Sequence, residues 1–317
     1  MSGRLSELFR NIEAEQDVHE LTKYCLESLR ESVNVYSGTN LVRDFKKLVK
    51  SVYETEPKMS LIIDQFNGIM DYLYDNCRQC FTNKNNDECS VRKHICDSID
   101  SFIIANEKKE NELCNHGKKV VLDGDVILIH SYSRSVMRVL CDAYDEGVKF
   151  QVIVAEQEFD KTLSILRLLQ KKGIFVKVVP EYMLSHIEND VTKVFMGVVT
   201  LNSQMLFVAA AGTSAIVSEF RLNNVPIYVF MSMGKMSLWK SHKGHDTHKV
   251  KHKKINELYN IEYERIKFSH DRVPLNYVNF IVTEEGIFNP KEIEKIYWSK
   301  YKIREGWNSQ HQWNTYK

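Results

Sequence analysis

The sequence is poor in proline, in net charge and in long apolar runs. Five prolines in 317 residues favour long, uninterrupted helices, because proline breaks a helix. Lys and Arg total 43 against 42 Asp and Glu, so charge gives no reason to expect nucleic acid or an anionic membrane as the main partner. No apolar run approaches the roughly 18 residues of a membrane span, and the first ten residues lack the apolar core of a signal peptide. We therefore expect a cytoplasmic protein.

Cysteine is scarce and odd in number. The seven cysteines show no disulfide-framework spacing, which favours reduced thiols in the cytosol. One cluster comprises Cys77, Cys80, Cys89 and Cys96 together with His94, but it holds a single C-x-x-C pair and no second tight pair. We interpret these residues as core or surface thiols rather than as a zinc site, and we expect no metal and no cofactor.

A basic stretch over residues 240–254 carries four histidines, His242, His245, His248 and His252. Their mixed three- and four-residue spacing would suit a metal only on a helix, and the interleaved lysines oppose a cation. We interpret the stretch as a solvated, mobile loop. It is also the only local basic patch in the sequence, so contact with an acidic partner or RNA is an alternative.

Apolar residues recur at helical spacing over residues 1–116, and nothing there resembles a catalytic motif. Thr39 or Asn40 is the expected N-cap of a helix that starts near Leu41. We predict a helical N-terminal domain over residues 1–116. Its clearest helices are expected at residues 41–52, 61–74 and 91–113.

Continuous apolar runs begin near residue 118 and alternate with helix-length segments. Strands buried on both faces and separated by helices are typical of a doubly wound, mostly parallel sheet. We predict a Rossmann-like α/β domain over residues 117–317, with ligands beyond the carboxyl ends of its strands. Its strands are expected at residues 126–129, 152–155, 175–179, 194–199, 227–230 and 278–282, and helices at 133–146, 160–172 and 181–189.

The most informative stretch covers residues 196–219. It has the pattern of a strand, a polar loop and a helix that opens on Gly212 and Thr213. The first N–H groups of a helix lack partners, so this helix start is a candidate anion site. The stretch holds no acidic side chain before Glu219 and no basic one. A pocket built here would therefore have no group for proton transfer.

A second candidate site follows the strand at residues 126–129. Ser133 is the expected N-cap of the next helix and Arg134 lies in its first turn, a combination that binds phosphate. The alternative is structural: Arg134 would pair with a carboxylate, and His130 would be a buried, satisfied histidine. Ser131 is a poor candidate nucleophile, because it lacks the glycines of a nucleophile elbow and a partnered base.

Residues 127–140, I-L-I-H-S-Y-S-R-S-V-M-R-V-L, resemble the strand-to-helix element of the alpha subunits of translation initiation factor 2B. That family, the guanine-nucleotide exchange factor for translation initiation factor 2, reads I-L-T-H-A-Y-S-R there. Residues 196–213 align without a gap on the family's segment that ends in I-G-T. Residues 226–230, Lys235 and residues 280–290 resemble its P-F-Y-V-V, F-K and L-F-T-D-L-G-V-L-T-P motifs. The resemblance covers most of residues 120–300.

The resemblance extends to isomerases of methylthioribose 1-phosphate and ribose 1,5-bisphosphate, which share the fold. Those enzymes use a Cys and an Asp, whose positions here hold Ser131 and Val199. A hydroxyl is too weak an acid to replace the thiol, and a valine transfers no proton. The resemblance therefore implies a protein without catalytic residues.

The phosphate pocket of these relatives is also altered. Ala209 and Ala210 stand where relatives have Asn-Lys, which removes an expected phosphate ligand. What the resemblance leaves as a possible phosphate pocket is the set Ser131, Arg134, Gly212, Thr213 and Lys235.

The resemblance implies a non-catalytic regulatory subunit that forms a homodimer through its α/β domains. The implied partners are the beta, gamma, delta and epsilon subunits of the exchange factor and the phosphorylated alpha subunit of initiation factor 2. We expect Arg43 and Lys46 to lie near the contact with that phosphorylated partner. The alternatives are an active sugar-phosphate isomerase and a protein that senses a sugar or nucleotide phosphate. No membrane and no direct nucleic acid contact is expected.

Overall fold

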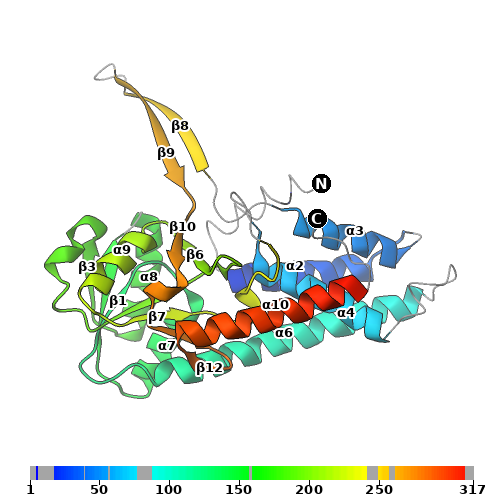
Figure 1. Ribbon diagram of the computed structural model, residues 1–317, viewed down its shortest axis with the longest axis horizontal. Coiled ribbons are helices and arrows are strands. Elements are labelled where there is room, and N and C mark those ends of the chain that lie inside the picture. Colours follow the sequence, from blue (N-terminus) through cyan, green and yellow to red (C-terminus); the bar gives the residue numbers. More distant parts are fainter. Residues whose placement is uncertain are drawn as a thin grey trace.

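The computed structural model describes residues 5, 18–38, 40–55, 58–76, 88–156, 159–240, 249–256 and 261–310. Figure 1 shows a group of long helices beside an α/β layer, with a two-stranded ribbon that projects away from both. Among the helices described, none is long and apolar enough to cross a membrane. The mixed α/β architecture with a helical N-terminal region confirms the predicted fold class.

In the described part of the N-terminal region the chain forms the helices α2 (Val18–Asn34), α3 (Leu41–Tyr53), α4 (Ser60–Asn76) and α6 (Glu88–Lys118). The side chain of Asn40 accepts a hydrogen bond from the Arg43 N–H at 2.8 Å, which confirms Asn40 as the N-cap of α3. Thr39, the other candidate cap, lies outside the described residues.

The helices pack around one apolar cluster that includes Leu21, Phe45, Ile62 and Ile95. Trp239, from the segment that follows strand β7 (Ile227–Phe230), is buried in this cluster at 6% exposure. The α/β layer therefore helps to complete the helical core. The proposed division of the chain at residues 116 and 117 falls within α6, which runs on to Lys118.

The main sheet has seven strands in the order β12-β11-β7-β4-β1-β2-β3. All neighbouring pairs are parallel except β11 with β12. The helices α7 (Arg134–Asp145), α8 (Phe159–Lys172), α9 (Thr213–Leu222) and α10 (Pro290–Gln310) accompany it. The strands are β1 (Val126–Ile129), β2 (Gln151–Glu156), β3 (Val176–Pro180), β4 (Lys193–Gly197), β7 (Ile227–Phe230), β11 (Phe280–Thr283) and β12 (Gly286–Phe288).

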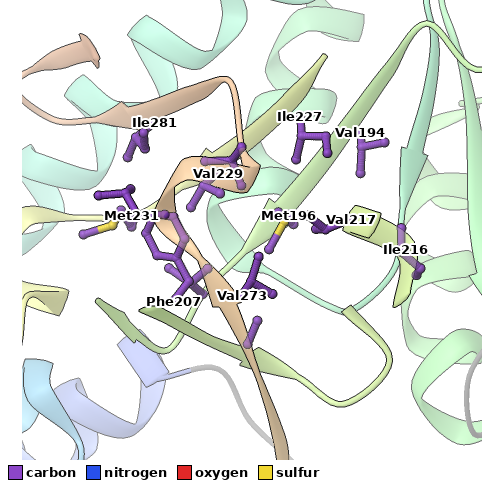
Figure 2. Packing of buried hydrophobic residues seen from close by; sticks show 14 of the residues in the cluster. Val194, Met196, Phe207, Ile216, Val217, Ile227, Val229, Met231, Val273 and Ile281 are labelled. Carbon is purple, nitrogen blue, oxygen red and sulfur yellow. The ribbon is translucent and has the colours of Figure 1, made fainter. Parts of the chain in front are cut away.

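A second, three-stranded sheet was not predicted. It has the order β10-β6-β5 and consists of β5 (Thr200–Leu201), β6 (Leu206–Ala210) and β10 (His270–Pro274), all antiparallel. Phe207 of β6 and Val273 of β10 pack against Val229 and Met196 of the main sheet, in the cluster shown in Figure 2. The two sheets thus share one core, and that core fixes the segment before α9.

Two sequence expectations are wrong in detail. The helix predicted at residues 181–189 is a short 3₁₀ turn, η1 (Glu181–His186), which starts directly after the strand ends in Pro180. The basic stretch expected to be a loop contains strand β8 (Lys249–Asn256), so His252 lies in a strand. His242, His245 and His248 lie outside the described residues.

Close packing at Gly197 joins β4 to the start of α7. A side-chain carbon at this position would collide with the Cβ and Oγ atoms of Ser133. Ser133 in turn caps α7, where its Oγ accepts from the Val136 N–H, as predicted. The glycine in the Met196–Gly197 motif therefore allows the cap of α7 to lie against the neighbouring strand.

Candidate functional site

The sequence-predicted pocket residues lie where β1, β4 and β7 end and α9 begins. His130 and Ser131 directly follow β1, and the 3₁₀ turn η2 (Met233–Lys235) follows β7. In a doubly wound sheet this edge is where ligands bind. The question is which polar groups at this edge are open to a ligand and which have partners within the chain.

Arg134 is bound by two carboxylates of the N-terminal helices. One guanidinium nitrogen donates to Glu20 of α2, and another donates to Glu107 of α6 at 3.4 Å. The Arg134 side chain is 24% exposed. Arg138, one turn further along α7, also donates to Glu107, at 3.4 Å. Arg134 therefore joins the α/β layer to the helices, which is the structural alternative considered for it.

The start of α9 is occupied by a carboxylate from β10. The Gly212 N–H and the Ser214 N–H both donate to Asp271 Oδ2 at 2.9 Å. These are N–H groups of the kind that a bound phosphate would accept from. Asp271 also neutralises the positive end of the helix dipole. An anion at this helix start would have to displace Asp271.

His130 is buried beneath Gly212 and held on both sides. Its Nε2 faces the Glu181 carboxylate, and its Nδ1 lies 3.3 Å from the Thr213 hydroxyl. That hydroxyl donates to the Ala210 carbonyl at 2.6 Å. A side-chain carbon at Gly212 would lie 2.9 Å from His130 Nε2 and 3.0 Å from both Glu181 oxygens. The backbone of α9 therefore closes over the pair.

Lys235 is buried, with 3% exposure, and its ammonium group donates to the Val198 carbonyl at 2.9 Å. The carbonyl oxygen of Lys235 accepts from Ser60 of α4 and from Thr200 of β5. Within the described part of the chain no carboxylate lies within 4.0 Å of its ammonium group. Of the two predicted cationic phosphate ligands, Lys235 is therefore the one without a carboxylate beside it among the described residues.

The positions of the two isomerase residues differ in their surroundings. Ser131 is half-buried in the turn after β1. Val199 packs against the apolar cluster of the N-terminal helices, and its N–H donates to the Val208 carbonyl at 2.8 Å. Ala209 is fully buried in the core that the two sheets share. The Asp position is thus part of the contact between the two layers.

A small cavity lies between α2, α4, α6 and η2. Its interior has space for about one water-sized group, far less than a pentose phosphate needs. Both carboxylate oxygens of Glu110 and the hydroxyl of Ser232 face buried surroundings there without a hydrogen-bond partner among the described residues. The cavity is lined by His19, Leu61, Gln65, Asn106, Lys109, Glu110, Ser232 and Gly234.

The sequence reading missed the carboxylates that fill this site. Glu181 directly follows a predicted strand, so its place at the carboxyl end of β3 was a usable signal. Asp271 lies in a strand that had no clear pattern of its own. Glu20 pairs with Arg134 across 114 residues of chain, and no spacing rule reports such a pair.

The two residues expected near the phosphorylated partner both lie on α3. Arg43 is 57% exposed and donates to Asp44 at 3.2 Å. Hydrogen bonds from the Tyr36 hydroxyl, Lys47 and Arg43 lower the pKa of Asp44 to about 2. Lys46 is half-buried, and its ammonium group lies 5.5 Å from the centre of the Tyr74 ring. Arg43 is therefore the more accessible of the two.

The described residues contain no group of three or more His, Cys, Asp or Glu side chains placed to hold a metal. Cys77 and Cys80 lie outside those residues. Burial raises the pKa of the Cys96 thiol, whose sulfur lies 3.4 Å from the Asn34 amide oxygen. Cys25, Cys96, Cys114 and Cys141 are free thiols.

A family model described as the initiation factor 2 subunit family matches residues 19–290. The match includes the N-terminal helices and both sheets. The chain belongs to this family. The family contains relatives of two kinds, named either as subunits of translation initiation factor eIF2B or as ribose 1,5-bisphosphate isomerases.

Curated relatives of each kind show similar identity. The eIF2B delta subunit of Dictyostelium discoideum is 26% identical over 223 residues, which cover 65% of this chain and 36% of that protein. This chain thus corresponds to about a third of that relative. The ribose 1,5-bisphosphate isomerase of Pyrococcus furiosus is 24% identical over 318 residues, 96% of each chain. Sequence similarity alone does not separate the two kinds.

Solved structures share the fold. The Pyrococcus horikoshii structure named translation initiation factor eIF-2B superposes with a TM-score of 0.72 at 22% identity and covers 90% of this chain and 97% of its own. The eIF2B beta structure of Chaetomium thermophilum has a TM-score of 0.67 at 15% identity, with 96% and 92% covered. At these identities the likeness establishes the fold.

Proposed function

We propose that this protein is the alpha-type regulatory subunit of the eIF2B exchange factor and that it catalyses no reaction. The observation that carries the proposal is that anion-binding groups of the predicted pocket are paired with carboxylates of the chain itself. Arg134 is paired with Glu20 and Glu107, and the start of α9 is capped by Asp271. A site in which Arg134 and the start of α9 are already paired stabilises the fold, and these groups are not open to a phosphate.

The Ser131 and Val199 positions support the same proposal. A hydroxyl and a hydrocarbon stand where the isomerases of the family resemblance have a thiol and a carboxylate. Val199 packs against the apolar cluster of the N-terminal helices. The residues at these two positions thus support a structural role rather than proton transfer.

Assembly with other subunits is part of the proposal. A relative is named as an eIF2B delta subunit, and one structurally similar chain comes from a tetrameric complex named eIF2B-beta2-delta2. We propose that this chain forms a homodimer that joins beta, gamma, delta and epsilon subunits in the cytoplasm. The domain division at residues 116 and 117 belongs to this proposal, with the α/β part as the dimerising unit.

Affinity purification tests the proposed assembly. The tagged full chain, expressed at its native level and purified under mild salt, is expected to bring down the beta, gamma, delta and epsilon subunits in a mass-spectrometric readout. An untagged culture is the control for background. Recovery of the chain free of all four subunits would contradict the proposal.

Sensing of phosphorylated initiation factor 2 is proposed for the surface of α3. A phosphoserine adds up to two negative charges and pairs well with arginine. Arg43 is exposed enough to meet it, whereas Lys46 is half-buried near Tyr74. Arg43→Glu is expected to weaken binding of the phosphorylated partner in pull-downs of the assembled complex. Unchanged binding would remove α3 from the contact.

The isomerase is the second candidate, and one observation favours it. The match to the Pyrococcus furiosus enzyme covers 96% of both chains, and the His130–Glu181 pair lies at the catalytic edge of the sheet. This candidate predicts turnover of ribose 1,5-bisphosphate by the purified protein, lost in Ser131→Ala and in Glu181→Gln. We expect no turnover. Turnover that both variants abolish would overturn the regulatory proposal.

A phosphate sensor is distinguished by a thermal-shift assay. A sugar or nucleotide phosphate that binds the folded state raises the melting temperature by mass action. We expect no shift with ribose 1,5-bisphosphate. Asp271 already accepts from the N–H groups at the start of α9, and Glu20 and Glu107 already pair with Arg134, so a phosphate would have to displace these carboxylates. A shift that disappears in Lys235→Met would show that the pocket still holds a ligand.

A further inference from the structure

The ribbon of β8 and β9 is separate from both sheets of the molecule. β8 (Lys249–Asn256) and β9 (Ile261–Phe268) pair antiparallel from Lys249↔Phe268 to Asn256↔Ile261 and form a two-stranded sheet of their own. Figure 1 shows the ribbon projecting away from the helices and from the α/β layer. Its position makes both of its faces available for contact.

The ribbon exposes large apolar side chains. All described side chains of β9 are exposed, including Tyr263 at 50%, Ile266 at 46% and Phe268 at 54%. An isolated two-stranded ribbon is marginally stable in water, since it has no core on which to pack. Exposed aromatic residues on a projecting ribbon are typical of a surface that a partner covers.

Charge is concentrated on the ribbon. Its two strands contain six Lys and Arg residues against two Glu residues. The formal net charge of the whole chain is only +1, so the rest of the chain is net negative. The partner that fits the ribbon is therefore an anion that the remainder of the surface would repel.

The register places both glutamates of β9 on one face of the ribbon. Alternate residues of a strand lie on opposite faces, so Tyr263, Arg265 and Lys267 share one face while Glu262 and Glu264 share the other. The pairing places Lys254 opposite Tyr263 and His252 opposite Arg265. Among the described side chains of β9, the first face thus carries one aromatic residue and two basic ones, and none of them is acidic.

A basic face that carries an exposed aromatic ring matches single-stranded nucleic acid. The cations contact the phosphates, and a base stacks on the ring. An acidic peptide would pair with the cations but would offer Tyr263 a flat group only where it also carries an aromatic side chain, whereas every nucleotide carries both a phosphate and a flat base. We propose that the Tyr263–Arg265–Lys267 face of the β8–β9 ribbon binds single-stranded nucleic acid. This proposal stands independently of the regulatory function proposed above.

The test is fluorescence anisotropy of the full-length protein with labelled oligouridylate and oligothymidylate over a range of salt. The double variant Arg265→Glu, Lys267→Glu is expected to bind at least about tenfold more weakly, with a salt slope shallower by about 1.4. Tyr263→Ala is expected to weaken binding about 5- to 150-fold while the salt slope stays unchanged. Comparable binding of both oligomers would show that the ribbon recognises the phosphate and the base, which RNA and DNA share. Tighter binding of one oligomer would identify RNA or DNA as the preferred ligand.

The matched control is Lys291→Glu, Lys295→Glu on exposed positions of α10, which changes the net charge equally. It is expected to bind as the unmodified protein does. An equal loss in this control would show that net charge alone drives binding and would overturn the proposal. So would absence of binding to either oligomer, tighter binding of a duplex, or equal binding of a polyglutamate peptide. Circular dichroism confirms that each variant is folded.

Discussion

Gly212 and Gly147 share a left-handed backbone but differ in their surroundings. Gly212 has φ of +98° and Gly147 has φ of +90°. A side-chain carbon at Gly147 would meet nothing within 4 Å, whereas one at Gly212 would press on His130 and Glu181. Alanine at Gly147 therefore measures the free energy of backbone strain alone, whereas alanine at Gly212 measures that strain together with the contact on His130 and Glu181.

Gly147→Ala is expected to lower the free energy of unfolding by about 1–2 kcal/mol through backbone strain. Gly212→Ala is expected to lower it by at least about 1 kcal/mol more, because the His130–Glu181 pair must also move. Urea denaturation of both variants measures the difference. Equal losses would show that the site has space above the pair, which would reopen it to a ligand.

The roles of single residues could be predicted where the signal lies within a few neighbouring residues of the chain. Asn40 and Ser133 were predicted as caps because a cap bonds to an N–H three residues away. The partners of Arg134 could not be predicted, since Glu20 and Glu107 reach it only once the helices dock on the sheet. For Arg134 the sequence left a phosphate role and a structural role open, and tertiary contacts provide the partners.

At the scale of elements, α10 is tied to α4 by one ion pair. Arg304 donates to both oxygens of Asp71 at 3.1 and 2.9 Å. Burial raises the pKa of the Asp71 carboxyl to about 6, although Arg304 acts to lower it, and the nearby Asp64 and Asp75 raise it further. Burial also raises the pKa of Asp64. The folded structure therefore disfavours the ionised form of Asp71 relative to the unfolded chain.

The pH dependence of the free energy of unfolding tests the raised pKa of Asp71. A folded pKa above the unfolded value means that the folded state binds the proton more tightly, so stability falls as pH rises from about 4 to about 6. We expect the unmodified protein to lose about 2 kcal/mol relative to Asp71→Asn across this range. Urea denaturation of both proteins at several pH values measures it. A difference independent of pH would contradict the raised pKa.

Prediction of elements succeeded where periodicity was strong. Strands buried on both faces, such as β1 and β7, show as apolar runs in the sequence. The three-stranded sheet was missed because β5 has two residues and β10 mixes charged with apolar side chains. Strand β8 was missed because its lysines suggest a wet loop. The strand forms because its backbone pairs with β9, and composition alone does not report that pairing.

At the scale of the whole molecule, the contact between the N-terminal helices and the α/β layer includes residues of the sequence-predicted pocket. Arg134, Ser60 with Lys235, and Val199 each connect the two layers. From Ser131 and Val199, the sequence predicts a protein without catalytic residues, and that prediction belongs to the proposed function. The Arg134–Glu20 and Ser60–Lys235 contacts could not be predicted, because their partners lie more than 100 residues apart in the chain.

The proposed homodimer is tested on the whole chain. Size-exclusion chromatography with light scattering is expected to give a mass of about twice 37.1 kDa at micromolar concentration. A monomer at all concentrations would contradict the dimer, while recovery of the other subunits could still succeed. The two measurements therefore test separate parts of the proposed function.

The attachment of the ribbon allows its length to vary. β10 pairs with β6 only from His270 onward, and Asp271, the next residue, caps α9. The strands before Ser269 share no backbone pairing with either larger sheet. Residues can therefore be inserted or deleted in the ribbon without shifting the register of the body. A chain shortened there should keep its fold, provided that the cut spares His270.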